Sequence, residues 1–267
     1  MLVFLATHGN APVFWSLMLV DHDQILLITI VITLYNNCYN SYINVSMHNI
    51  KIVKMDGKPM NHEKQKLRKN IYNKLIENHI STPHYIGRIP DFKGSNEAAE
   101  NLRQTPEWVE SHTIFVSPDT AQKKVRENAL LDKKILIMVT PKIQHGYLKL
   151  EHDQFQGEKK HEHFREASTK EGAFKYGVKI DKLPNVDLVI EGSVAVDLEG
   201  GRLGKGGGYG DREIEYLKTT GSITPNTPIV STLHNLQIVE TVPTEEHDQK
   251  INMIVTPDKV LRLKNYH

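Results

Sequence analysis

Apolar side chains in residues 61–79 recur at helical spacing. Leu67, Ile71 and Leu75 are four residues apart, and lysines and arginines occupy many of the positions between them. One face of such a helix is apolar and the opposite face is basic, so the pattern predicts an amphipathic helix.

Helix-start signals predict where two further helices begin. Thr105 is followed by Pro106, the pattern of an N-cap residue with proline at the first helical position. Asp119 and Gln122 have the spacing of a capping box, which we expect to open a helix running to about residue 131. Helical patterns are also present in two other segments, at residues 95–104 and 211–217.

Short apolar runs between these helices predict buried strands. The runs lie at residues 113–117, 134–139, 186–190, 193–196, 229–233 and 251–255. Strand, helix and strand in succession favour βαβ units and a parallel sheet. We therefore predict an α/β fold, a single three-layer domain with a mostly parallel central sheet flanked by helices.

Residues 154–167 are polar and contain two histidines, His161 and His163. Histidine ligands of a metal need three or four convergent groups, typically at i, i+4 on a helix or closely spaced. This segment has no such spacing, so we predict a mobile surface loop.

The N-terminal region, residues 1–54, differs from the rest of the chain. Its apolar blocks, residues 11–20 and 25–35, fall short of the roughly 20 apolar residues that a membrane-spanning helix needs. No basic stretch precedes them as in a signal peptide, and the second block suits a strand as well as a helix. We interpret residues 1–54 as a non-conforming extension translated from an over-long gene model, with the domain at residues 55–267. A membrane-associating segment is the competing interpretation.

Composition narrows the possible partners and the compartment. The 267 residues carry a formal net charge of +1, so no overall field favours DNA, RNA or an anionic membrane. The single cysteine, Cys38, excludes an internal disulfide and a cysteine-type zinc site. We therefore expect a cytoplasmic protein, with no membrane partner for residues 55–267.

A glycine-rich segment carries the clearest candidate chemistry. Seven glycines fall between residues 200 and 210, interleaved with Arg202, Lys205 and Tyr209. Glycine lets the backbone approach an anion closely, and the helix expected from Asp211 would direct its N-terminus toward the same place. Neither GxxxxGK[ST] nor GxGxxG fits the segment, so it is not a Walker-type or nicotinamide-binding loop. We predict that it holds the phosphates of ATP; the alternative is a flexible turn between strand and helix.

Four motifs in order resemble those of 5-formyltetrahydrofolate cyclo-ligases, over residues 61–263. Residues 202–212 (RLGKGGGYGDR) resemble the RLGxGxGYYDR signature of that family, and residues 64–68 (KQKLR) its KxxLR motif. Residues 187–190 (DLVI) and 237–248 (QIVETVPTEEHD) are similar to two further segments. The domain is thus identified as cyclo-ligase-like.

Other residues point to one branch of this family, the methenyltetrahydrofolate synthetase domain-containing proteins. The similar segments are residues 117–119 (SPD), 140–141 (TP), 191–196 (EGSVAV) and 204–206 (GKG). Three departures from typical cyclo-ligases lie on the folate side of the site: residues 117–120, Glu191 in place of proline, and Gly210 in place of a second tyrosine. They leave the identity of the substrate open.

The resemblance implies ATP- and Mg²⁺-dependent cyclisation of 5-formyltetrahydrofolate to 5,10-methenyltetrahydrofolate, with release of ADP and phosphate. Arg202, Lys205 and Tyr209 would be catalytic, and Asp211 and Asp248 would hold Mg²⁺. The implied ATP-binding residues are Lys64, Arg68, Arg202, Leu203, Gly204, Lys205, Gly206, Gly207, Gly208, Tyr209, Gly210 and Asp211. Two of these have plainer interpretations, Lys64 as a solvated lysine and Tyr209 as a core aromatic.

Two alternative functions remain open at this point. The chain could be a regulator that binds nucleotide or folate without turnover, which the departures near residues 117–120 and 191 favour. It could also be RNA-associated, but the near-zero net charge and the lack of an aromatic RNP1-like motif count against that function.

Overall fold

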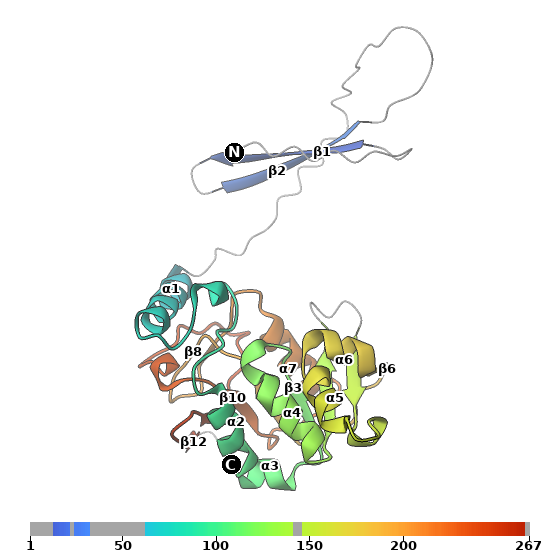
Figure 1. The fold of residues 1–267 in the computed structure, drawn as a ribbon. Helices are drawn as coiled ribbons and strands as arrows, with labels where there is room; N and C mark the ends of the chain where they lie inside the picture. The colour runs from blue at the N-terminus through green and yellow to red at the C-terminus, as the bar shows by residue number, and fades with distance from the viewer. Residues whose placement is uncertain (1–12, 22–23, 33–61, 141–145, 265–267) are drawn as a thin grey trace, which may run out of the picture. The chain divides into compact units, whose positions relative to one another are not determined.

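The computed structural model describes residues 13–21, 24–32, 62–140 and 146–264 (Figure 1). The chain divides into two compact units, Met1–Pro59 and Met60–His267. In the first unit, β1 (Val13–Asp21) and β2 (Gln24–Ile32) pair as antiparallel strands. Strands thus form in both apolar blocks of the N-terminal region, whereas the predicted domain boundary at residue 54 lies outside the described residues.

The second unit alternates helices and strands along most of its length. Its α-helices are α1 (His62–Glu77), α2 (Ser95–Arg103), α3 (Pro106–Glu110), α4 (Lys123–Leu131), α5 (Lys160–Ala167), α6 (Lys170–Tyr176) and α7 (Tyr209–Thr219). Short 3-10 turns lie at η2 (Pro83–Tyr85), η3 (Thr120–Gln122), η5 (His152–Gln154) and η6 (Asn235–Gln237). Within the described part of the chain, no helix combines the length and the apolar character needed to cross a membrane.

One eight-stranded sheet forms the centre of this unit, in the order β12-β11-β10-β7-β3-β4-β5-β6. Its strands are β3 (Thr113–Val116), β4 (Ile135–Val139), β5 (Tyr147–Leu150), β6 (Val178–Ile180), β7 (Leu188–Glu191), β10 (Ile229–Thr232), β11 (Met253–Val255) and β12 (Val260–Arg262). The central five strands, β11 to β4 in this order, are parallel, and the pairs nearer the two edges are antiparallel. A separate antiparallel pair joins β8 (Ala195–Val196) to β9 (Arg202–Leu203).

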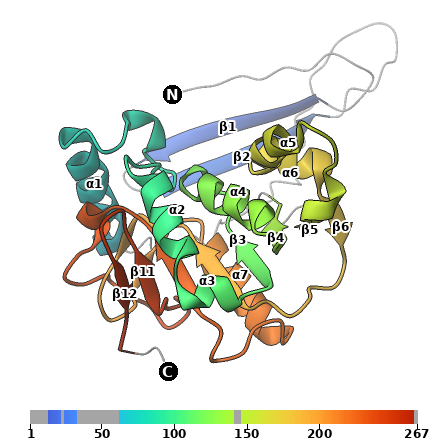
Figure 2. The ribbon, with the colours of Figure 1, turned by 60° about the horizontal axis from the view of Figure 1, so that its bottom comes forward.

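Alternate residues of the strands face opposite layers, which explains why the central strands are apolar throughout. Ile114 and Val116 pack in the core under helices α2 to α6, where α2 and α4 lie side by side (Figures 1 and 2). Phe115 points to the other face and shares its core with Ile214 and Leu217 of α7. Helices therefore cover both faces, and the predicted three-layer α/β fold with a mostly parallel sheet is confirmed.

Local signals predicted two helical segments correctly but the capping contacts of only one, since η3 and α4 together run from Thr120 to Leu131 as expected. The Thr105 hydroxyl accepts a hydrogen bond from Trp108 N at 3.2 Å and caps α3, as expected. The capping box at Asp119 is wrong, because Gln122 instead donates its amide to Thr232 across the core and the Asp119 side chain makes no cap.

The predicted loop at residues 154–167 is also wrong over its second half, which is the helix α5. Phe164 and Ala167 of this helix are fully buried in the core, and its remaining residues are polar. The helix is thus stabilised by two apolar residues that pack against neighbouring elements. Two apolar positions are too few to produce a clear periodic pattern in the sequence.

Candidate functional site

The order of strands in the sheet indicates where a ligand would bind. The chain passes from β3 to β4 on one side of β3, and later returns to place β7 on the other side. Ligands of open α/β sheets bind at such a switch point, beyond the carboxyl ends of the parallel strands.

A pocket of about 250 Å³ lies at this position. Pro118 and Asp119 follow β3, Thr140 follows β4, and Glu191 ends β7. The glycine-rich segment between β9 and α7 forms another wall. The predicted site residues in the lining are Arg202, Gly204, Lys205, Gly207, Gly208, Tyr209, Gly210 and Asp211.

The glycines in this loop adopt conformations that other residues rarely take. Gly206 and Gly208 have φ values of +110° and +63°, and Gly208 is the N-cap of α7. A Cβ atom on Gly207 would lie 2.7 Å from the ring of Tyr209, which packs directly against it. Among the described residues, no side chain caps the start of α7. The exposed amides of such a helix terminus favour an anion.

Two of the predicted cations have different surroundings at the loop. Arg68 contacts the loop from α1, and Lys205 belongs to the loop and reaches Asp119. Arg68 of α1 donates its Nε–H to the carbonyl of Gly204 at 2.8 Å, and its guanidinium lies over Gly206. Lys205 Nζ lies 3.2 Å from Asp119 Oδ1, and the lysine side chain is 37% exposed. Arg68 therefore fixes the position of the loop, whereas the partly exposed Lys205 side chain can contact a ligand.

Arg202 lies beneath the loop rather than on its surface. Its side chain is 2% exposed and forms an ion pair with Asp211 in the first turn of α7. Asp211 Oδ1 also accepts a hydrogen bond from Gln249 N at 3.0 Å. Gly210 passes so close that a Cβ atom would lie 3.1 Å from the Arg202 guanidinium, and Leu203 is buried beside it in β9. This ion pair therefore joins the two ends of the loop.

Lys64 and Asp248 form a second buried pair, and neither residue lines the pocket. Lys64 also bonds Glu245 Oε2 at 3.1 Å, and its side chain is 9% exposed. The interpretation of Lys64 as a solvated lysine is therefore wrong. Burial alone would raise the pKa of Asp248, but hydrogen bonds from Lys64 and from the backbone of Glu245 outweigh it and hold that pKa below its usual range.

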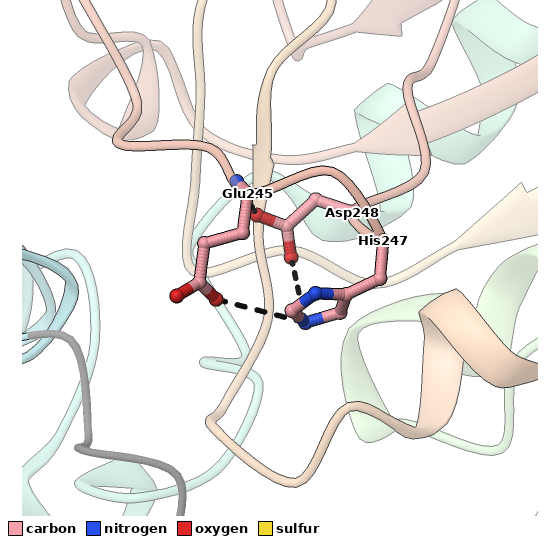
Figure 3. A group of neighbouring side chains, drawn as sticks. All are labelled: Glu245, His247 and Asp248. Atoms are coloured by element: carbon pink, nitrogen blue, oxygen red, sulfur yellow. Dashed lines mark hydrogen bonds and ion pairs between the residues drawn. The ribbon is translucent and has the colours of Figure 1, made fainter.

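Figure 3 shows His247 between the carboxylates of Glu245 and Asp248, at 3.6 and 3.8 Å. Potential ligand atoms of these three residues lie within 4.8 Å of one another. Asp211, the other predicted metal ligand, is outside this group and connects to it through Gln249, the residue after Asp248.

Two buried acids near the loop are not among the predicted catalytic, ATP-binding or metal-binding residues, although the motif comparison placed Glu191 on the folate side of the site. Burial, and then the charge of Glu213, raise the pKa of Glu191 well above its usual value. Burial and the charge of Asp119 raise the pKa of Glu213 to about 7. Glutamate at the end of an otherwise apolar strand was the available signal for Glu191, whereas Glu213 gave none, because charged residues surround it in the sequence.

A buried arginine, also missed, supports the strand end that carries Asp119. Arg126 Nη1 donates to the carbonyls of Ser117 and Asp119 at 2.5 and 2.9 Å, and its Nε donates to Ser168 O at 2.7 Å. Complete burial lowers the pKa of Arg126 to about 10. Three carbonyl acceptors thus stabilise a buried cation and fix the loop after β3.

Fold and site together define a three-layer α/β protein with a pocket at the switch point of its sheet. The profile of the 5-formyltetrahydrofolate cyclo-ligase family matches residues 60–257, so the chain belongs to this family. The family predicted from the motifs is confirmed.

Similar proteins include the branch that the motifs indicated. The human methenyltetrahydrofolate synthase domain-containing protein is 33% identical over 214 residues, which are 78% of this chain and 55% of the relative. The Bos taurus protein of the same name is 34% identical over 205 residues, covering 74% of this chain and 53% of the relative. The chain thus spans about half the length of these curated relatives.

A bacterial enzyme and a solved structure extend the comparison. The 5-formyltetrahydrofolate cyclo-ligase of Escherichia coli K12 is 38% identical over 78 residues, 29% of this chain and 40% of that protein. The NMR structure of Aquifex aeolicus 5,10-methenyltetrahydrofolate synthetase matches with a TM-score of 0.51 and 24% identity, over 75% of this chain and 93% of that one. This structural match supports the fold.

Proposed function

We propose that this protein catalyses ATP- and Mg²⁺-dependent cyclisation of 5-formyltetrahydrofolate to 5,10-methenyltetrahydrofolate, releasing ADP and phosphate. The observation that carries the proposal is the glycine loop at the start of α7, which forms one wall of the switch-point pocket in a member of this family. The substrates are a reduced folate and ATP, both small molecules.

The loop has the features that a polyphosphate needs. Gly206 and Gly208 turn the backbone through left-handed conformations, and the first amides of α7 have no side-chain cap. Lys205 adds a half-exposed positive charge at the pocket. Backbone amides, a helix N-terminus and one partly exposed lysine together suit the terminal phosphates of ATP.

The carboxylates near the loop fit a hard divalent cation. Asp211 uses Oδ1 for Arg202 and Gln249, and its second oxygen takes neither of these bonds. Asp248 and Glu245 offer further oxygens. Mg²⁺ is held by one or two carboxylates plus phosphate oxygens. We propose Asp211 and Asp248 for this role, in which the bound ion would neutralise phosphate charge.

In the proposed reaction the formyl oxygen of the substrate attacks the γ-phosphorus and ADP leaves. N10 then closes on the activated carbon and phosphate departs. Such transfer depends on positioning and on charge neutralisation. Lys205 would stabilise the transferred phosphoryl group, Arg202 would hold the loop, and Tyr209 would pack against the substrate.

A regulator that binds the same ligands without turnover is the second candidate. The observation that favours it is the pairing of the predicted phosphate ligands Lys64 and Arg202 with carboxylates in buried positions. These pairs leave fewer cations free for catalysis.

Turnover by the full chain tests the proposal. We would mix the protein with Mg-ATP and 5-formyltetrahydrofolate and follow the absorbance of the methenyl product. Lys205→Met should lower the rate at least about a hundredfold, because a charge that stabilises transferring phosphate is worth several kcal/mol. The matched control is Lys182→Met, an exposed lysine outside the pocket, which should behave as the wild type. ATP binding without any product would instead support the regulator.

A further inference from the structure

One acid in the pocket has an oxygen without a partner. Glu191 ends β7, is 3% exposed and lines the switch-point pocket. Its Oε1 atom is buried and makes no hydrogen bond to any residue that the structure describes. An unpaired buried polar atom destabilises the fold, so it persists where something else compensates or where a ligand supplies the missing partner.

The pocket around Glu191 is suited to a flat ring. Ile89, Pro118 and Val139 contribute apolar lining, and Gly192 has no side chain to obstruct it. A Cβ atom on Gly192 would lie 2.9 Å from both Ile89 and Asp119, so this part of the wall fits only a glycine without rearrangement. The pocket thus combines apolar walls with an acceptor at the strand end.

The position of Glu191 limits which ligand group it can meet. A Cβ atom on Gly210 would lie 3.1 Å from Glu191 Oε2, so the acid lies directly beside the glycine loop. In ATP the ribose and the phosphate chain separate adenine from the γ-phosphate. An adenine at Glu191 would leave no room for them before the loop. The formyl-bearing pterin, by contrast, must lie next to the γ-phosphate in order to react.

We propose that Glu191 binds the 2-aminopyrimidine edge of the folate pterin, with Oε1 accepting a hydrogen bond from the 2-amino group, and is therefore a specificity-determining residue. The inference rests on the proposed function. A carboxyl group complements this edge in either charge state, since a carboxylate accepts two N–H bonds and an acid accepts one and donates to the ring nitrogen. The remaining pocket residues then orient the formyl group toward the loop.

Direct binding to the full chain tests this assignment without requiring turnover. We would measure the Kd of 5-formyltetrahydrofolate and of Mg-ATP by calorimetry for the wild type, Glu191→Met and the control Glu199→Met. Methionine matches the length of glutamate and carries no carboxyl oxygen, and Glu199 is exposed and outside the pocket. Glu191→Met should weaken folate binding roughly 10- to 100-fold and leave Mg-ATP binding within about threefold.

A ligand analogue gives an independent measurement on the unmodified protein. The 2-desamino analogue of 5-formyltetrahydrofolate should bind the wild type about as weakly as the parent folate binds Glu191→Met. The variant itself should not distinguish the two ligands.

Unchanged folate affinity in a folded Glu191→Met chain overturns the assignment, and so does equal binding of both folates to the wild type. Loss of Mg-ATP binding in place of folate binding also overturns it. Folate binding that depends on Glu191 without product formation leaves the assignment standing and refutes the cyclo-ligase function. Product formation with an unchanged folate KM in Glu191→Met supports the cyclo-ligase function and overturns the assignment of Glu191.

Discussion

Arg202 should contribute strongly to the free energy of unfolding of this protein, in addition to any part it plays in ligand binding. It is 2% exposed, forms an ion pair with Asp211, and lies among the buried acids Glu191 and Glu213, whose charges it offsets. The change Arg202→Met keeps much of the side-chain volume and removes the charge. Removal of one partner from a buried pair costs about 3–5 kcal/mol, because the other charge stays buried and unpaired.

The structure favours the lower end of that range. Arg202 Nε is buried and has no hydrogen-bond partner within the described part of the chain, so part of the cation is already poorly solvated in the wild type. Glu191 and Glu213 can also stay protonated, since burial and neighbouring charges raise the pKa of both. We therefore expect a loss of about 3 kcal/mol, which lowers Tm by roughly 6–12 °C in a domain of this size.

Urea and thermal unfolding followed by circular dichroism measure this loss. Adding Asp211→Asn to Arg202→Met should recover part of the stability, because the unpaired carboxylate is then neutral. Lys175→Met, which removes one partner of an exposed pair with Glu166, should leave the midpoint close to that of the wild type. A loss below about 1 kcal/mol for Arg202→Met, or a double variant no more stable than the single one, would refute the reasoning.

Two further changes test the loop and the acid stability of the fold. Gly208→Ala and Gly221→Ala both place alanine at positive φ (+63° and +70°), and each should lower the free energy of unfolding by about 1–2 kcal/mol. Only Gly208→Ala should also weaken Mg-ATP binding, because Gly208 is at the N-terminus of α7. Equal Mg-ATP binding by both variants would contradict this. Burial raises the pKa of Asp132, but hydrogen bonds from Arg103 and an indole N–H outweigh it and hold that pKa below its usual value. The ionised Asp132 therefore stabilises the fold above about pH 4, and this stabilisation is lost as the pH falls through the folded-state pKa. The free energy of unfolding of Asp132→Asn should differ most from that of the wild type at neutral pH and converge with it in acid. The exposed control Asp181→Asn should follow the wild type at every pH.

Periodicity predicted the elements that bury a continuous apolar face. The helix α1 and the central strands β3 and β4 lie within two residues of their expected bounds, because each carries apolar positions at the spacing of its own structure. The antiparallel strands β5 and β6 were missed. Both are short, and β6 is exposed over two of its three residues, so alternation along the chain is too weak to mark them.

The chemistry of the loop could be predicted from the sequence, but its ion pairs could not. Glycines next to a lysine are visible in eleven residues of sequence, whereas Lys205 and Asp119 are 86 positions apart and meet only through the sheet topology. The motif also placed Arg202 and Lys205 in one role. Burial separates them, since one is 2% exposed and the other 37%.

This difference in exposure assigns different tasks to the cations that the motifs indicated. Arg68 donates to the carbonyl of Gly204, whereas three of these cations are already paired with a carboxylate that a polyphosphate must displace in order to bind. The three pairs are Lys64–Asp248, Arg202–Asp211 and Lys205–Asp119. Breaking either buried pair costs several kcal/mol, whereas the Lys205–Asp119 pair, whose lysine is 37% exposed, costs less to break. Lys205 is therefore the cation that can exchange its partner for phosphate, while the two buried pairs keep α1, the loop and α7 together. Substitution of Lys205 should thus affect ligand binding with little effect on folding, and substitution of Arg202 should affect folding first.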